Sequence, residues 1–400
     1  MPRDYRASRG AGVDLQETAE QTTLRKELSA YLATLMSDEE RRQLAIEQVG
    51  GPRFRQFIKR LGEDRWLGVG WPVEYGGRGR PIQDQYVFFD ELMRTGLPFP
   101  FVTINTVGPT LMAAGTPEQK AKYLSGMLSG DIVFAIGYTE PEAGTDLASL
   151  RTRAVPDGND WIINGAKVFT TGANTADYVW LACRTDPAAP KHRGVSIFIV
   201  PTSSPGFSWT PIKLVGGNIT TATSYQDVRI PADNLVGTLN GGWQLITTQL
   251  NHERIGLAAN GGRMIALWEQ VLAWTRRTGV IDLAWVQQDM ARAAALLEAM
   301  RLINWKMAWA VARDGLKGAQ AAAAKVFGTE THVEVQLILL AVLGAAGRVR
   351  SGTEAHCLAG EVEHTSRQGI VNTFGGGVNE VLRDMVATAG LGMPRPQRGQ

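Results

Sequence analysis

The spacing of apolar residues changes twice along the chain. From about residue 17 to 130, apolar positions recur at helical spacing and are interrupted by Gly- and Pro-containing loops such as Gly68–Pro81. Thr116-Pro117-Glu118-Gln119 predicts a helix start, because it combines a threonine N-cap, a proline at the first helical position and a capping-box glutamine. We therefore expect an N-terminal α-helical domain over 17–130, preceded by a disordered segment over 1–16.

Between residues 131 and 234 the period drops to two, which is typical of β-strands. Two apolar runs, Trp161–Ile163 and Lys167–Phe169, flank Asn164-Gly165, a dipeptide that predicts the turn of a β-hairpin. Further short strands are predicted at Tyr178–Cys183, Val195–Val200, Phe207–Ile212 and Tyr225–Ile230. Antiparallel strands at this spacing predict a middle β domain, a small sandwich or barrel.

Helical periodicity returns after about residue 235 and persists for long runs. We predict helices near 243–275, 284–313, 318–345 and 360–388, the first two breaks falling at Gly279–Asp282 and Asp314–Leu316. Four long helices on short loops predict an antiparallel four-helix bundle over 235–391, followed by a tail over 392–400. The predicted fold class is therefore multi-domain α+β, with helical, β and helical-bundle domains in that order.

Composition narrows the functional classes. The 41 basic and 39 acidic residues give a net charge of +2, which argues against binding to nucleic acid, because such binding needs clustered positive charge. Two cysteines exclude a disulfide framework. The N-terminus does not resemble a signal peptide, and the longest apolar stretch, Leu337–Gly347, is shorter than the roughly 20 residues that span a bilayer. We expect a cytoplasmic protein with no membrane partner.

Several kinds of catalytic chemistry lack their motifs. The chain has neither a glycine pattern of the dinucleotide-binding fold nor a Gly-Lys-Ser/Thr loop. His252-Glu253 begins like a zinc-protease motif, but Gly256 stands where the second histidine would be. The five histidines have no metal-ligand spacing, and no serine lies in a nucleophile-elbow context. We therefore predict no metal site and no hydrolytic mechanism.

The segment Gly137–Asp146, GYTEPEAGTD, is the first candidate binding element. It reads as a strand end, a sharp turn at Glu140-Pro141, and a loop that exposes the hydroxyls of Thr139 and Thr145. Backbone N–H groups and short hydroxyls in this order suit one edge of a planar ligand. The same pattern also fits an ordinary proline turn in which Asp146 caps a short helical turn.

The run FAIGYTEPEAGTD, followed some 25 residues later by NGAKVFTTGAN, resembles the signature of the acyl-CoA dehydrogenase family. The segments Leu67–Gly77 and Gly115–Lys120 match two further family segments in order, so the resemblance covers about residues 24–391. It implies an FAD-dependent oxidoreductase that dehydrogenates an acyl-CoA thioester to the trans-2-enoyl-CoA.

The resemblance also implies which residues hold FAD. The Tyr138 backbone and the Thr139 hydroxyl match positions that contact the pyrimidine edge of the flavin, and Thr145 matches a position that meets a phosphate. Phe169 stands where the family usually has tryptophan; it keeps an aromatic face but loses the indole N–H, and it also fits a buried strand residue. The FAD-binding residues implied are Tyr138, Thr139, Gly144, Thr145, Phe169, Thr170 and Thr171.

Dehydrogenation needs a carboxylate base beside the acyl chain, in an apolar site that raises its pKa. The position that carries this glutamate in many family members aligns with Gly376. Glu253 instead shares one helical stripe with Ile246, Leu250 and Leu257, so a carboxylate interrupts an apolar face. This segment resembles the alternative base site of a minority of the family, and we predict Glu253 as the base. A structural ion pair is the other interpretation.

The residues around Glu253 resemble the family's substrate positions. Asn251 and Arg254 match positions around the thioester end of the acyl-CoA and the loop beneath it, although Arg254 also fits a structural partner for a carboxylate. The end of the chain, Phe374–Asp384, and the base segment resemble α-subunits of actinobacterial heterotetrameric dehydrogenases that act on steroid side-chain CoA thioesters of the 3-oxocholest-4-en-26-oyl-CoA type. Gly375–Gly377 would leave room for such a bulky or branched acyl group.

In family homotetramers, two segments of each subunit bind the FAD of a neighbouring subunit. Both segments depart from the family pattern in this chain. Arg276–Ile281 lacks a Gln-Phe pair, and Ala341–Gly347 has alanine in place of a glutamine and of one glycine. Alanine has no hydrogen-bonding side chain. The resemblance therefore implies an α2β2 heterotetramer with a second acyl-CoA dehydrogenase-like subunit, a homotetramer being the alternative, and an electron-transferring flavoprotein as acceptor. Two other functions stay open: an oxygen-using enzyme such as an acyl-CoA oxidase, and a non-catalytic structural subunit.

Overall fold

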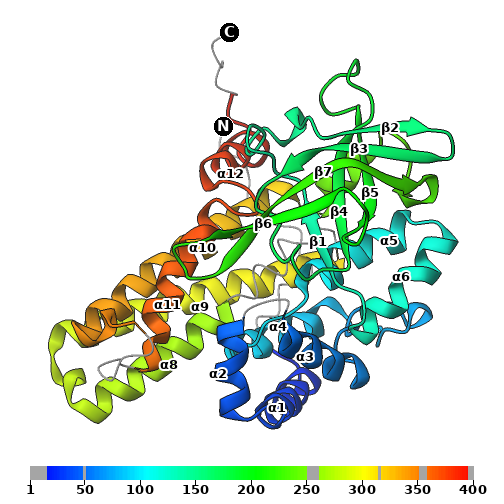
Figure 1. Cartoon of the computed structure of the whole chain (residues 1–400). Coiled ribbons are helices and arrows are strands. Elements are labelled where there is room, and N and C mark those ends of the chain that lie inside the picture. The colour runs from blue at the N-terminus through cyan, green and yellow to red at the C-terminus, as the bar shows by residue number, and fades with distance from the viewer. Residues whose placement is uncertain (1–15, 48–50, 250–260, 314–316, 351–357, 395–400) are drawn as a thin grey trace.

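The computed structural model describes residues 16–47, 51–249, 261–313, 317–350 and 358–394. Most of the predicted disordered segment 1–16, the predicted break Asp314–Leu316 and the last residues of the predicted tail lie outside the described residues. A helical N-terminal region, a β-sheet and a helical C-terminal region follow one another along the chain, as predicted (Figure 1).

The regular elements described in the N-terminal region are helices. Its α-helices are α1 (Ala19–Thr34), α2 (Asp38–Glu47), α3 (Pro52–Glu63), α4 (Ile82–Arg94), α5 (Gly108–Ala114) and α6 (Pro117–Ser129), with a π-helix, η2 (Val102–Val107), before α5. The predicted start of α6 is confirmed: the Thr116 hydroxyl accepts from the Gln119 N–H at 3.2 Å, and the Gln119 side chain accepts from the Thr116 N–H at 3.1 Å. Gly130, at φ 79°, ends the helix in the left-handed conformation that glycine adopts without strain.

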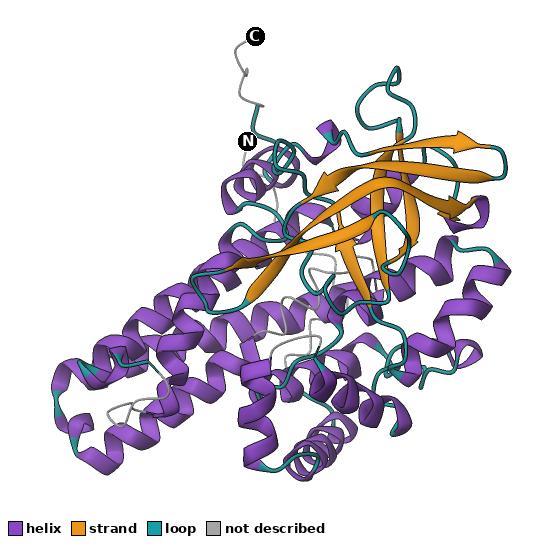
Figure 2. Ribbon diagram, viewed as in Figure 1, coloured by secondary structure: helices purple, strands orange, loops and turns teal. Residues whose placement is uncertain are grey.

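The middle region is one eight-stranded sheet. Its strands are β1 (Phe134–Gly137), β2 (Arg153–Asp157), β3 (Asp160–Lys167), β4 (Tyr178–Arg184), β5 (Val195–Pro201), β6 (Phe207–Lys213), β7 (Ile219–Pro231) and β8 (Leu235–Val236). The order is β6-β7-β3-β2-β4-β5-β8, and β1 pairs in parallel with β4. Strands β6, β7, β3 and β2 run across β1, β4 and β5 (Figure 2), so the sheet folds over on itself around a buried core.

The predicted hairpin turn at Asn164-Gly165 is wrong. These residues lie inside β3, where the pairing with β7 shifts register between Ile163 and Gly165, as in a β-bulge. The Asn164 amide donates to the Asp227 carboxylate at 2.9 Å, so it is bonded across the two strands. The real turn lies between β2 and β3, at residues 158–159. Because β2 is mostly exposed, its sequence lacks the apolar alternation that would have revealed it.

The C-terminal region contains α8 (Gly261–Thr278), α9 (Ala284–Arg313), α10 (Gly318–Leu343), α11 (Glu361–Gly369) and α12 (Asn379–Met385). The bounds predicted for α9 are confirmed. The single helix predicted over 360–388 is wrong, because the chain breaks after Gly369 into a 3-10 turn, η8 (Ile370–Thr373), and a glycine turn. Gly376 and Gly377 have φ of 66° and 111°, values that a helix does not allow. α11 and α12 together take the place of the fourth helix against α10.

The first predicted bundle helix is only partly described. Residues 242–249 are helical, and α8 begins at Gly261 after a segment outside the described residues. Among the helices that the structure describes, α10 is the one long and apolar enough to cross a membrane by length and composition. It packs against α8, α9, α11 and α12, which makes it the central helix of the bundle.

Candidate active site

The sheet brings the two candidate binding segments together. Tyr138 and Thr139 directly follow β1, and Val168 directly follows β3. The Val168 N–H donates to the Thr139 carbonyl at 2.9 Å. Residues that are far apart in the sequence therefore form one edge, with the TEPEAGTD loop on one side and Phe169–Thr171 on the other.

Phe169 is exposed at this edge. Its side chain keeps 58% of its surface accessible, so the interpretation of Phe169 as a buried strand residue is wrong. Its φ of 60° lies in the left-handed region, which bulky residues rarely adopt and which costs about 1–3 kcal/mol. The backbone after it is held by the Thr170 N–H, which donates to the Thr221 carbonyl at 2.9 Å. An apolar ring is thus presented to solvent at a fixed position.

The threonines near Phe169 face different surroundings. Thr170 is 1% exposed, and its hydroxyl lies 3.3 Å from that of Thr223, inside the sheet. Thr171 is exposed, and its hydroxyl lies 2.9 Å from that of Thr220. The half-buried Thr139 hydroxyl has no hydrogen-bond partner within the described part of the chain. Thr139 and Thr171 can therefore meet a ligand through their side chains, whereas the Thr170 side chain supports the sheet.

A buried ion pair holds the start of the loop. Lys167 donates from Nζ to the Glu140 carboxylate at 2.8 Å and to the Tyr138 carbonyl at 3.0 Å. Glu140 also accepts from the N–H groups of Arg151 and Thr152, at 2.6 and 2.8 Å. Burial alone would raise the pKa of the Glu140 carboxyl, but the charge of Lys167 and these hydrogen bonds lower it below its ordinary value. The loop therefore starts from a buried ion pair in which both carboxylate oxygens of Glu140 are bonded.

The rest of the loop is open. Gly144 and Thr145 are exposed, and a Cβ added to Gly144 would meet no atom within 4 Å. Asp146 precedes a short 3-10 turn, as the proline-turn interpretation expected, but its carboxylate does not cap that turn and instead pairs with Lys191 at 2.8 Å. The Thr145 hydroxyl has no partner among the described residues, so it is available to a ligand.

A chain of three side chains joins Tyr138, directly after β1, to the helical residues 242–249. The Tyr138 hydroxyl accepts from the Trp180 indole N–H at 3.1 Å and donates to the Gln249 side-chain oxygen. Sequence reasoning missed this chain, since no local pattern relates three residues on separate elements. The predicted base Glu253 and the predicted substrate residues Asn251 and Arg254 follow Gln249 but lie outside the described residues, so these predictions stay untested.

The position where many family members would carry the base is described. Gly376 lies in the exposed glycine turn between η8 and α12. Lys325 of α10 holds this turn by donating to the Gly377 carbonyl at 2.6 Å and to the Asn379 side-chain oxygen at 2.8 Å. Glu380, the nearest carboxylate in sequence, is exposed on α12.

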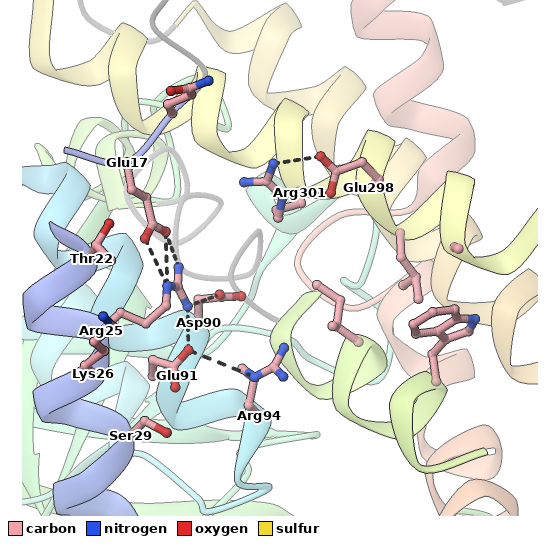
Figure 3. A pocket seen from close by; sticks show the side chains of 15 residues that line it. Glu17, Thr22, Arg25, Lys26, Ser29, Asp90, Glu91, Arg94, Glu298 and Arg301 are labelled. Atoms are coloured by element: carbon pink, nitrogen blue, oxygen red, sulfur yellow. Dashed lines mark hydrogen bonds and ion pairs between the residues drawn. The ribbon is translucent and has the colours of Figure 1, made fainter. Parts of the chain in front are cut away.

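A cleft of about 960 Å³ lies elsewhere, between α1 and α4 on one side and α8 and α9 on the other (Figure 3). Charged side chains line it, and Figure 3 shows Arg25 between Glu17, Asp90 and Glu91. No residue of the TEPEAGTD loop, of Phe169–Thr171 or of the glycine turn lines this cleft. Among the described residues, the cleft between the two helical regions therefore shares no lining residue with the candidate flavin-binding edge.

Comparisons with known proteins agree with the geometry. The N-terminal, middle and C-terminal domains of acyl-CoA dehydrogenases match residues 18–131, 135–228 and 240–391 of this chain. The chain is 47% identical over 395 residues to the acyl-CoA dehydrogenase FadE26 of Mycobacterium tuberculosis, covering 95% of this chain and 99% of the relative. It is 48% identical over 385 residues to FadE29 of the same organism, with the same coverage.

Two solved structures are similar over nearly the whole chain. One is described as the Tcur3481-Tcur3483 steroid ACAD, with 66% identity, a TM-score of 0.94 and coverage of 96% of this chain and 100% of that one. The other is the ChsE4-ChsE5 complex from Mycobacterium tuberculosis, with 46% identity, a TM-score of 0.90 and the same coverage. The chain belongs to the acyl-CoA dehydrogenase family and is an oxidoreductase.

Proposed function

We propose that this chain is the catalytic α-subunit of a heteromeric, FAD-dependent acyl-CoA dehydrogenase in the cytoplasm. Its substrate would be a bulky acyl-CoA, with a steroid side chain or a branched chain, and its product the trans-2-enoyl-CoA. The observation that carries the proposal is the edge, joined by the Val168–Thr139 backbone bond, that holds the exposed Phe169 ring, the Thr171 hydroxyl and the Thr139 hydroxyl, which has no partner among the described residues. The 66% identity to a protein described as a steroid ACAD supports the substrate class.

The residues at this edge fit FAD. An exposed aromatic ring offers a stacking surface to a flat ring system, while the hydroxyls of Thr139 and Thr145, unpartnered among the described residues, suit its polar edge and its phosphates. In this proposal Phe169 and Thr171 cover the flavin ring, Tyr138 and Thr139 hold its pyrimidine edge, and Gly144 and Thr145 meet a phosphate. Thr170 contributes through its backbone position. When bound, FAD supplies the acceptor for the hydrogen removed from the β-carbon.

Glu253 is the proposed base. A carboxylate on an otherwise apolar stripe is costly unless it is paired or functional, and an apolar site raises its pKa towards working pH. Glu253 would take the α-proton of the thioester, while Asn251 and Arg254 would hold the thioester end of the substrate. The described Gly376 supports this assignment, since the position that usually carries the base has no side chain.

The proposed partner is a second acyl-CoA dehydrogenase-like subunit in an α2β2 assembly. The segments Arg276–Ile281 and Ala341–Gly347 lack the side chains with which family members grip a neighbour's cofactor. Two of the similar structures are each named for two proteins, Tcur3481-Tcur3483 and the ChsE4-ChsE5 complex. We also propose an electron-transferring flavoprotein as the acceptor. Purified alone, this chain should hold little FAD, and co-expression with its partner should restore it; full loading of the lone chain would favour a homotetramer.

The decisive experiment is Glu253→Gln in the co-expressed complex. Removing a general base should lower kcat by roughly 10²–10⁴-fold, while the bound flavin keeps its absorption spectrum. Glu380→Gln, which removes an exposed carboxylate on α12, is the matched control and should leave kcat unchanged. A Glu253→Gln complex as active as wild type would refute the assignment of the base. Activity confined to the partner subunit would favour a structural role, and peroxide as the product of reoxidation would favour an oxidase.

A further inference from the structure

The side-chain bridge Trp180–Tyr138–Gln249 has no role in the function proposed so far. Its members come from three elements: Trp180 from β4, Tyr138 from the end of β1, and Gln249 from the helical residues 242–249. Trp180 is fully buried, Gln249 is 1% exposed and Tyr138 is half-buried, so both hydrogen bonds are largely shielded from water. Hydrogen bonds in such surroundings are stronger electrostatically and costly to leave unmade.

Tyr138 is held at both ends. Its backbone carbonyl accepts from the buried Lys167, and its hydroxyl both accepts from Trp180 and donates to Gln249. Ile136, two residues before Tyr138, pairs with Trp180 between β1 and β4. The phenol ring of Tyr138 therefore extends from a rigid part of the sheet. The position of Tyr138 is therefore set by the sheet, and the position of Gln249 follows from that of Tyr138.

Gln249 is also incompletely bonded. Its side-chain nitrogen is buried and has no hydrogen-bond partner within the described part of the chain. A buried donor without a partner costs about 1–3 kcal/mol, which packing alone does not explain, since an apolar side chain of equal size would avoid that cost. The first turn of this helix also packs tightly against the sheet. A Cβ atom added to Gly242 would lie only 2.9 Å from the Ser196 backbone of β5. The helix is thus held against the sheet at both its first and its last described turn.

We propose that Tyr138 and Gln249 are positioning residues, which set the end of the described helix 242–249, four residues before Glu253 in the sequence, relative to the flavin-binding edge. This inference rests on the proposed function. Tyr138 contacts the flavin through its backbone in that proposal, and Gln249 lies four residues before the proposed base. The bridge then couples the two groups between which the acyl-CoA must lie, so that the α- and β-carbons meet base and flavin together.

The test is a double-mutant cycle of Tyr138→Phe and Gln249→Met in the co-expressed complex. Each substitution removes the hydrogen bond with little change in volume. Each should lower kcat by roughly 10- to 100-fold with little effect on KM, because misplacement of reacting groups by about 1 Å has effects of this size. The double variant should be no slower than the slower single variant, since both changes break one bridge.

The flavin spectrum and a control variant separate positioning from loss of stability. The absorption bands of the bound flavin should shift in Tyr138→Phe, because the backbone that contacts the flavin in this proposal loses the side-chain bonds that hold it, and Tyr31→Phe is the matched control. Tyr31 loses an equivalent hydroxyl, bonded to Asp64 at 2.6 Å in the N-terminal region, and this variant should keep wild-type kcat and spectrum. Additive effects, or wild-type kcat in both single variants while Glu253→Gln is inactive, would overturn this inference alone. Failure of Glu253→Gln to lose activity would instead reject the proposed base.

Discussion

Two networks of buried charges hold this chain together, and they are built differently. Beneath the TEPEAGTD loop, one Glu140–Lys167 pair is surrounded by backbone donors and acceptors, and both carboxylate oxygens of Glu140 are bonded. In the cleft between the two helical regions, a single guanidinium, that of Arg25, bonds three carboxylates, those of Glu17, Asp90 and Glu91. One network pairs one cation with one acid, whereas in the second Arg25 serves three acids, and Arg94 approaches only Glu91, at 4.0 Å.

The two networks shift the pKa values of their most buried carboxylates, Asp90 and Glu140, in opposite directions. Oδ1 of Asp90 is buried without a hydrogen-bond partner among the described residues. Burial raises the pKa of the Asp90 carboxyl despite the neighbouring Arg25. Glu140 has the opposite shift, since the nearby charge and hydrogen bonds outweigh its burial. A buried carboxylate is therefore stabilised by complete bonding of its oxygens, and the presence of a cation alone is not enough.

The largest effect should come from Lys167→Met. It leaves the buried Glu140 carboxylate without its charge partner, which typically costs about 3–5 kcal/mol of unfolding free energy. The matched control is Lys191→Met, which breaks a pair with Asp146 in which both side chains are more than half exposed, and it should cost at most about 1 kcal/mol. Chemical denaturation measures both values. Equal small losses would mean that the network under the loop is not structurally important.

Arg25→Met should have the next largest effect. It leaves Asp90 and Glu91 buried without the guanidinium that bonds them at 2.7 and 2.5 Å. Because Arg25 keeps 25% of its side-chain surface exposed, water can replace part of the interaction, and we expect a loss of roughly 2–3 kcal/mol. Arg229→Met, which removes an exposed partner of Asp160, is the control for denaturation. A loss for Arg25→Met larger than that for Lys167→Met would reverse the comparison.

The smallest effects concern pH and should have opposite signs. Glu140 has a lowered folded-state pKa, so its stabilisation is present above its unfolded-state pKa and is lost as pH falls through the folded one. Asp90 has a raised folded-state pKa, so its contribution is present at acid pH and is lost as pH rises through that value. Unfolding free energies measured from about pH 3 to pH 7 should rise less steeply in Glu140→Gln than in wild type, and more steeply in Asp90→Asn. Slopes that change in the same direction would contradict the assigned shifts.

Local signals predicted much of the fold correctly. The capping box at Thr116 and the periodicity of 284–313 depend on residues within a few positions of one another, and both were confirmed. The hairpin turn predicted at Asn164-Gly165 was wrong because the same dipeptide suits both a turn and a bulge. Only the pairing of β3 with β7 distinguishes the two. The break within 360–388 was missed although Gly375–Gly377 lie inside it, because the apolar periodicity on either side of the glycines was read as continuous.

The candidate site was predictable in its residue types but not in its arrangement. Thr139 and Phe169 were identified from a family resemblance, whereas the exposure of the Phe169 ring and the inward orientation of Thr170 were not. Thr139 and Val168 are joined by one backbone hydrogen bond between segments that no local pattern relates. The Trp180–Tyr138–Gln249 bridge likewise joins residues that are distant in the chain, so no local sequence pattern predicts it.

The sequence by itself determined the order of helical, β and helical regions, the chemical groups available to the site, and the lack of a side chain at Gly376, since each is carried by local periodicity or by residue identity. The tertiary structure decided which carboxylate is balanced, which aromatic ring stays exposed and which tyrosine bridges sheet and helix. These outcomes depend on burial and on contacts between residues distant in the chain. Both are properties of the packed molecule, because the cost of burying a charge or a donor is known only once its neighbours are in place.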